Sequence, residues 1–92
     1  MALVRLRGPL RALAGGEAQH RVDGDGVAAV LAELERAQPA LRGWVLDERG
    51  AIRRHINVFV NGEYADRDTP LEAEDRVEVL PAISGGQARD DT

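Results

Sequence analysis

Residues 54–60 read RHINVFV, and Asn61-Gly62 follows them directly. Within this stretch β-branched side chains recur at every second position, a period that is typical of a strand with one face in a core. Asn-Gly is the dipeptide that two-residue hairpin turns favour, because both of its residues tolerate a positive φ. The stretch therefore predicts a strand that turns back at once into a short partner near 63–65.

Three more segments have strand character. Residues 2–7 (ALVRLR) and 76–80 (RVEVL) alternate apolar and charged side chains, which favours strands with one buried face. Residues 17–22 (EAQHRV) are more polar and follow the turn signal at Gly15-Gly16. We therefore expect an edge strand there.

One amphipathic helix is predicted from residue 26 to residue 37. Its apolar residues recur at the i, i+3, i+4, i+7 spacing of one helix face, and they are Val27, Val30, Leu31 and Leu34. Asp25 is the expected N-cap of this helix. A short helical turn is expected at 41–45, with Trp44 against the core. Residues 68–71 are expected to form a turn that leads into a single helical turn.

The element order is thus β-β-α-β-β-β, with a short turn after the main helix. This order predicts an α+β fold in which the helix packs across one face of a mixed sheet and the other face stays open. Strand alternation places Leu3, Arg5, Phe59 and Leu80 on the open face. Three apolar side chains there indicate a partner surface, and the alternative is that they are scattered exposed residues without a role.

The last predicted strand is followed by PAISGG (residues 81–86) and then by the polar stretch QARDDT (87–92). A Gly-Gly pair by itself marks only a flexible loop. Here the pair follows the last strand and a proline, and nothing after it has the periodicity of a helix or strand. This context makes Gly85-Gly86 the candidate functional motif.

Four stretches together resemble the MoaD/ThiS family of sulfur carriers, which are prokaryotic relatives of ubiquitin. They are INVFVNG (56–62), TPL (69–71), EDRVEVLP (74–81) and ISGG (83–86), in the order and spacing of the family. The resemblance implies a ubiquitin-like β-grasp domain over residues 1–83. It implies a flexible C-terminal tail over residues 84–92.

The resemblance also implies the chemistry. A ThiF- or MoeB-like adenylating enzyme uses ATP to join AMP to the carboxylate of Gly86, and a sulfur donor then displaces AMP and leaves a thiocarboxylate. Glycine suits this motif, Ser84-Gly85-Gly86, because a residue without Cβ passes through a narrow tunnel. The carrier is expected to be no enzyme and to bind no cofactor. The residues expected to bind partners are Leu3, Phe59, Leu80, Pro81 and Ile83.

One departure from the family concerns the end of the chain. Members normally end at Gly-Gly, whereas residues 87–92 follow Gly86 here. A free Gly86 carboxylate therefore requires a protease, such as a JAMM-type zinc metalloprotease. The alternatives are that the tail is an artificial addition or that the protein is not a carrier. We favour a natural precursor, because the tail contains no common purification tag.

Composition disfavours several other functions. The chain has no cysteine, and all 12 basic residues are arginine, so no lysine amine accepts an isopeptide bond. A net charge of −4 argues against nucleic acid as the main partner. His20 and His55 fall on separate predicted strands without a suitably spaced nucleophile or carboxylate, so we expect no catalytic site and no metal site. No signal peptide or membrane span is visible, and we expect a cytoplasmic protein.

The pathway rests on a finer resemblance. RHINVFVN (54–61) and LPAISGG (80–86) look most like the CysO-type carrier of cysteine biosynthesis. This implies a PLP-dependent cysteine synthase as the sulfur-accepting partner. The first alternative is the small subunit of molybdopterin synthase, working with the large subunit. ThiS-like delivery to thiamin or a secondary metabolite is another alternative, and a ubiquitin-like modifier joined to target lysines is a more distant one.

Overall fold

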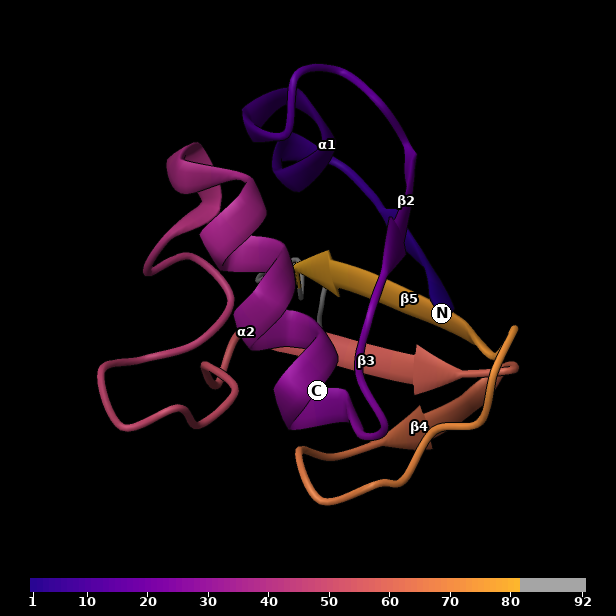
Figure 1. Ribbon diagram of the computed structural model, residues 1–92. Coiled ribbons are helices and arrows are strands. Elements are labelled where there is room, and N and C mark those ends of the chain that lie inside the picture. The colour runs from indigo at the N-terminus through magenta and orange to yellow at the C-terminus, as the bar shows by residue number, and fades with distance from the viewer. Residues whose placement is uncertain (82–92) are drawn as a thin grey trace, which may run out of the picture.

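The computed structural model describes residues 1–81, which form a five-stranded mixed sheet with helices on one face (Figure 1). The strand order is β2-β1-β5-β3-β4. The central strands β1 and β5 run parallel, and all other neighbours run antiparallel. The strands are β1 (Ala2–Leu6), β2 (Gln19–Val22), β3 (Ile56–Val60), β4 (Glu63–Ala65) and β5 (Arg76–Pro81).

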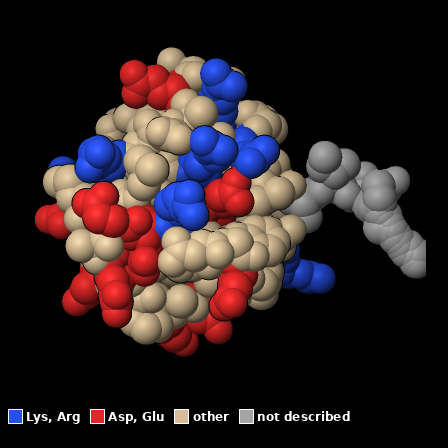
Figure 2. All heavy atoms as spheres, turned by 90° about the vertical axis from the view of Figure 1, so that its right-hand side faces the viewer, with Lys and Arg blue, Asp and Glu red and all other residues tan. Residues whose placement is uncertain are grey.

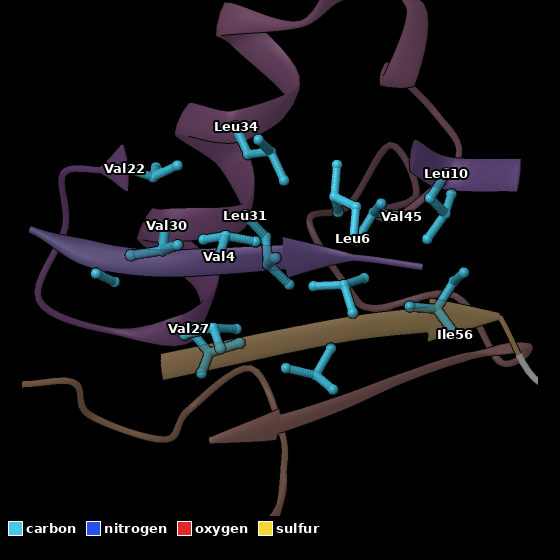
Figure 3. Close-up of a cluster of buried hydrophobic side chains, with 14 of the residues drawn as sticks. Val4, Leu6, Leu10, Val22, Val27, Val30, Leu31, Leu34, Val45 and Ile56 are labelled. Carbon is cyan, nitrogen blue, oxygen red and sulfur yellow. The ribbon is translucent and has the colours of Figure 1, made fainter. Parts of the chain in front are cut away.

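Helix α2 (Val27–Ala37) lies across one face of this sheet, as predicted (Figure 1). Its four apolar positions are buried, and they meet the inward side chains of the strands in one core (Figure 3). The buried partners from the two central strands include Val4, Leu6, Val77 and Val79. Burying a valine or leucine side chain contributes about 1.5–3 kcal/mol, so this layer of contacts holds the helix on the sheet.

The hairpin between β3 and β4 forms at the predicted dipeptide. Asn61 has φ 50° and Gly62 has φ 90°, the left-handed conformations that the Asn-Gly pair tolerates. Asn61 also ties the turn to the neighbouring strand, because its Oδ1 accepts a hydrogen bond from the Arg76 N–H at 2.9 Å. Its Nδ2 donates to Asp75 Oδ1 at 3.1 Å. The turn therefore sets the register of β3 and also anchors the start of β5.

The structure corrects two expectations about helices. Helix α1 (Pro9–Leu13) was not predicted, although its Leu10 is buried in the core. A five-residue helix is too short to show the apolar periodicity on which the sequence reading depends. A turn forms at 66–69, close to the turn predicted at 68–71, and in it the Thr69 N–H donates to the Asp66 carbonyl at 3.2 Å. The single helical turn expected to follow is wrong, because Pro70 forms an isolated β-bridge with Gly26 and the chain between β4 and β5 contains no helix.

Two predicted residue positions are also corrected. Gly26, and not Asp25, is the N-cap of α2, and the chain before it is held extended because the Asp25 carbonyl accepts the Leu71 N–H at 3.0 Å. The short helix η1 (Pro39–Leu41) stops before Trp44. Trp44 therefore lies outside the core, with 48% of its surface exposed.

None of the helices within residues 1–81 is long and apolar enough to cross a membrane. The longest of them, α2, has 11 residues, whereas a spanning helix needs about 20.

Candidate functional site

The face of the sheet opposite α2 carries one continuous row of side chains across all five strands. Arg5 of β1 lies opposite Gln19 of β2 and Glu78 of β5. Phe59 of β3 lies opposite the same Glu78 and, on its other side, Tyr64 of β4. Because partners in a ladder project to the same side, these five residues form the middle of the open face.

The aromatic end of this row is formed by Phe59 and Tyr64. Their ring centroids are 5.7 Å apart with an interplanar angle of 79°, which is the favourable edge-to-face arrangement. Tyr64 is 70% exposed, while Phe59, its partner on the neighbouring strand, is half-buried. The pair therefore presents a fixed aromatic surface at one side of the open face.

The predicted partner-binding residues Leu3, Phe59 and Leu80 all lie on this face, and each is half-buried. They are not side by side, because Leu3 lies opposite Arg76 and Phe59 lies opposite Glu78. Charged side chains of β5 thus separate Leu3 from the aromatic pair. The docking role of these residues stays a prediction.

The open face is basic, although the chain as a whole is acidic with a net charge of −4. Its outward positions include Arg5, Arg21 and Arg76, all exposed. The adjacent Arg7 donates from Nη2 to Glu78 Oε2 at 2.7 Å. Figure 2, which views the end where β3 stops and β5 starts, shows basic side chains mainly in its upper half and acidic ones mainly in its lower half.

A shallow hollow of about 400 Å³ lies within this basic area. Its lining is mostly polar and charged, and it includes Leu3, Arg5, Gln19, Asn61, Arg76 and Glu78. Sequence alternation predicted Arg5 on this face. The other arginines were missed, although the same alternation places Arg21 and Arg76 there and could have found them.

The described chain leaves the sheet at Pro81, the last residue of β5. On one side, Pro81 lies opposite Ile56 of β3. On the other side, its ring lies beside Gly8, so that a Cβ atom added to Gly8 would be 3.6 Å from the ring. Figure 3 shows Leu10, Val45 and Ile56 around this end of β5. The predicted motif residues Ile83, Ser84, Gly85 and Gly86 lie outside the described residues.

No group of three or more potential metal ligands occurs within residues 1–81. His20 Nε2 is paired with the Glu17 carbonyl at 3.0 Å, and His55 is exposed just before β3. His20 therefore lies on β2, as predicted, whereas His55 lies one residue before β3 and not within it.

Sequence reasoning missed the structural role of Glu35. This residue of α2 is 8% exposed, and its Oε2 accepts the N–H groups of Val45 and Leu46, each at 3.0 Å. No sequence signal distinguishes it from the exposed acid Glu33 one half-turn away, because its partners come from a distant loop. Glu35 fixes the segment that approaches the end of β5.

A family comparison decides the identity of this arrangement. The family model described as the ThiS family matches residues 4–86, which is nearly the whole chain. The chain belongs to the ThiS family. The resemblance to the MoaD/ThiS group of ubiquitin-like sulfur carriers is thereby confirmed.

Individual relatives agree with the family. The chain is 42% identical over 69 residues to small archaeal modifier protein 1 of Haloferax volcanii, covering 72% of this chain and 79% of that protein. A chain of the Amycolatopsis orientalis BexX/CysO complex matches with a TM-score of 0.82 at 26% identity, covering 94% of this chain and 100% of that one. CysO of Mycobacterium tuberculosis matches with a TM-score of 0.80 at 27% identity, covering 90% and 100%. The ubiquitin-like β-grasp fold of this ThiS-family member is thus confirmed.

Proposed function

We propose that this protein is a sulfur carrier whose Gly86 carboxylate is adenylated and then thiocarboxylated once residues 87–92 have been removed. The observation that carries the proposal is the extent of the family match, which stops at residue 86. That residue is the second glycine of Ser84-Gly85-Gly86, and the six residues after it fall outside the match. The family domain and the candidate reactive end therefore coincide.

The proposed chemistry takes place on the chain and is catalysed by its partner. A carboxylate oxygen of Gly86 attacks the α-phosphate of ATP in the activating enzyme, and pyrophosphate leaves. Sulfide then attacks the acyl-adenylate carbon, the bond between this carbon and the phosphate oxygen of AMP breaks, and AMP leaves behind a thiocarboxylate. The carrier contributes an end of two glycines, which have the smallest possible cross-section because they lack Cβ. ATP is the co-substrate of the activating enzyme. The proposed location of the carrier is the cytoplasm.

The open face is the proposed docking surface for the ThiF/MoeB-like activating enzyme. β5 runs through this face and continues directly into the tail, so a partner on the face has the tail within reach. The exposed arginines would be complementary to carboxylates on the partner, and the Phe59–Tyr64 pair would bind the partner as an aromatic anchor. Leu80, Pro81 and Ile83 would lead from this surface into the partner's channel.

Cysteine biosynthesis is the proposed pathway. It is supported by the likeness to two CysO-containing structures at 26% and 27% identity. The resemblance to CysO-type carriers implies that the thiocarboxylate attacks an activated serine on a PLP-dependent synthase, and that a JAMM-type metalloprotease later releases cysteine from the carrier. Molybdopterin synthase, with its large subunit as the partner, and ThiS-like delivery to thiamin or a secondary metabolite remain the alternatives within the carrier class.

A second candidate function is protein modification. It is favoured by the 42% identity to a relative that is named a modifier. In that role the activated Gly86 would be joined to a lysine amine of a target protein. The two functions share the adenylation step and differ in the nucleophile that follows it.

The experiment incubates residues 1–86 with the cognate activating enzyme, ATP and sulfide, and measures intact mass. We expect the mass increase that accompanies exchange of one oxygen for sulfur, and none for Gly86→Ala, whose methyl group obstructs the channel. Adding cysteine synthase with activated serine, or lysates containing target lysines, then separates the carrier from the modifier. If no product forms with an activating enzyme that is shown to activate another carrier in the same reaction, both the carrier function and the modifier function are contradicted.

A further inference from the structure

Trp44 is exposed without a reason in the fold. It is 48% exposed, and the other large apolar residues exposed within residues 1–81 are Met1 and Tyr64. Tyr64 belongs to the aromatic pair of the open face. Trp44 lies elsewhere, in the segment 42–55 that connects η1 to β3. Tryptophan is among the residues most enriched at the energetic centres of protein interfaces.

The backbone around Trp44 is held in place from both sides. The Trp44 N–H donates to the Leu41 carbonyl at 2.8 Å, and the preceding Gly43 carbonyl accepts Arg53 Nε at 2.5 Å. The N–H groups of the next two residues, Val45 and Leu46, both donate to the buried carboxylate of Glu35. An exposed side chain on a fixed backbone costs less to order on binding, which is the property of a preorganised anchor.

The remainder of the segment is ordered by its own hydrogen bonds. Asp47 Oδ1 accepts the N–H groups of Ala51 at 3.0 Å and Arg49 at 2.8 Å, and these two bonds hold the pKa of Asp47 below its usual value. Leu46 and Ile52 form a β-bridge that closes the segment on itself. Trp44 is therefore presented by a rigid loop, although the segment contains no helix or strand.

This loop lies at the end of the molecule where the tail starts. The Arg53 N–H donates to the Val45 carbonyl, and the Arg53 carbonyl accepts the Ile56 N–H, each at 2.9 Å. Ile56 lies opposite Pro81, the last described residue of β5. Figure 1 shows β5 running toward this loop, and Figure 3 shows Val45 and Ile56 near the end of the strand.

The charge around Trp44 defines the surface it would meet. Arg42 and Arg54 are exposed, and Arg53 is half-exposed. Within residues 1–81 the salt bridges are Arg7–Glu78 and Arg36–Glu33, so none of these three loop arginines forms a salt bridge in the described chain. Asp47 of the same loop is near Arg53, whose charge helps the two backbone hydrogen bonds to lower the pKa of Asp47. A complementary surface would offer an apolar pocket for the indole with carboxylates at its border.

We infer that Trp44, with the arginines of the 42–55 loop, is a second docking site for the enzyme that activates the tail, separate from the open face. This inference rests on the proposed function. The enzyme contacts both the open face and the Trp44 loop, which lies near Pro81, the last described residue. Its surface at the mouth of the channel bears an apolar pocket bordered by carboxylates.

The test uses residues 1–86 and the cognate activating enzyme. Trp44→Ala should raise the KM for the carrier at least about tenfold and leave kcat unchanged, because a docking contact stabilises the bound carrier before and during the reaction. Trp44→Phe should recover part of the loss. Arg42→Glu should also raise KM, since it places a carboxylate against the partner's carboxylates. Glu63→Ala, an exposed change at the opposite end of the sheet, serves as the matched control and should leave KM unchanged.

A binding measurement without turnover accompanies the kinetics. The chain contains one tryptophan, so 5-fluorotryptophan labelling produces one carrier resonance in fluorine NMR. We expect this resonance to shift or broaden when the enzyme is added without ATP. An unchanged resonance at saturation, or an unchanged KM for a folded Trp44→Ala protein, overturns the inference while wild-type thiocarboxylation upholds the proposed function. Failure of the wild-type protein to react overturns both.

Discussion

At the scale of single residues, Glu35 carries the largest structural consequence. It is the one charged side chain buried among residues 1–81, and its carboxylate satisfies two loop N–H groups. Glu35→Ala leaves both donors without a partner inside the protein. We expect a loss of about 2–4 kcal/mol in the free energy of unfolding, measured by urea denaturation.

Glu33→Ala is the matched control for this substitution. Glu33 lies on the same helix and pairs with Arg36 at the surface, where ion pairs contribute little. Its removal should change stability far less than removal of Glu35. If the two variants unfold at the same urea concentration, the carboxylate of Glu35 does not hold the loop.

Asp75 should make stability depend on acid pH. Its carboxylate accepts the Glu72 N–H at 2.9 Å and the Asn61 amide at 3.1 Å, and these bonds lower its pKa in the folded protein. A lowered folded pKa means that the stabilisation is present above the unfolded value of about 3.9 and is lost as pH falls through the folded value. Asp75→Asn should therefore be less stable than wild type at pH 7, with the difference shrinking below about pH 4.

Denaturation midpoints of wild type and Asp75→Asn between pH 2 and pH 7 provide the check. Parallel curves over that range would show that the charge of Asp75 has no part in holding the turn.

At the scale of elements, strand β3 separates the two faces of the sheet. Val58 is buried in the core, whereas the next residue, Phe59, points to the open face and contacts Tyr64. Val58→Ala should cost roughly 2 kcal/mol of stability, and Phe59→Ala about 1 kcal/mol. Phe59→Ala should in turn weaken binding to the activating enzyme, measured by calorimetric titration. A larger stability loss for Phe59→Ala than for Val58→Ala would place Phe59 in the core.

The elements that could be predicted from sequence are those with a repeated pattern. β3, β5 and α2 have clear periods, and the Asn61-Gly62 turn has its own chemistry, so each appears where the pattern placed it. Helix α1 spans five residues and offers no period to detect. Trp44 was assigned to the core because it is apolar, and only the tertiary structure shows that η1 ends before it.

The candidate site also has some features that the sequence predicted and others that only the tertiary structure shows. Strand alternation placed Leu3, Phe59 and Leu80 on one face, since that requires only local geometry. The separation of Leu3 from Phe59 by charged residues depends on which strand lies between β1 and β3. The role of Glu35 depends on a loop ten residues away in the chain. Both are properties of the tertiary fold, which sequence periodicity does not encode.

At the scale of the whole molecule, the strand that precedes the tail is the middle strand of the sheet. This strand, β5, is paired on both sides, and its last residue, Pro81, lies opposite Ile56, which is hydrogen-bonded to the Trp44 loop. Charge is divided as well, with arginines on the open face and around Trp44 in a chain of net charge −4. We therefore infer that residues 1–81 form a docking module for the reactive end that follows them.

The precursor form should be inert for a chemical reason. In the full chain Gly86 ends in an amide, which has no charged oxygen to attack the α-phosphate of ATP. The carboxylate on Thr92 is the available substitute, but a β-branched side chain does not fit a channel shaped for glycine. Asp90 and Asp91 would also be repelled by the phosphates of the nucleotide.

The decisive measurement is the intact mass of residues 1–92 and residues 1–86 after incubation with the same activating enzyme, ATP and sulfide. We expect the 1–86 form to gain the mass difference between sulfur and oxygen, and the 1–92 form to stay unchanged until a protease removes its last six residues. Equal thiocarboxylation of both forms would contradict the precursor mechanism. Failure of both forms, with an enzyme shown to activate another carrier in the same reaction, would contradict the assignment of this protein as a sulfur carrier.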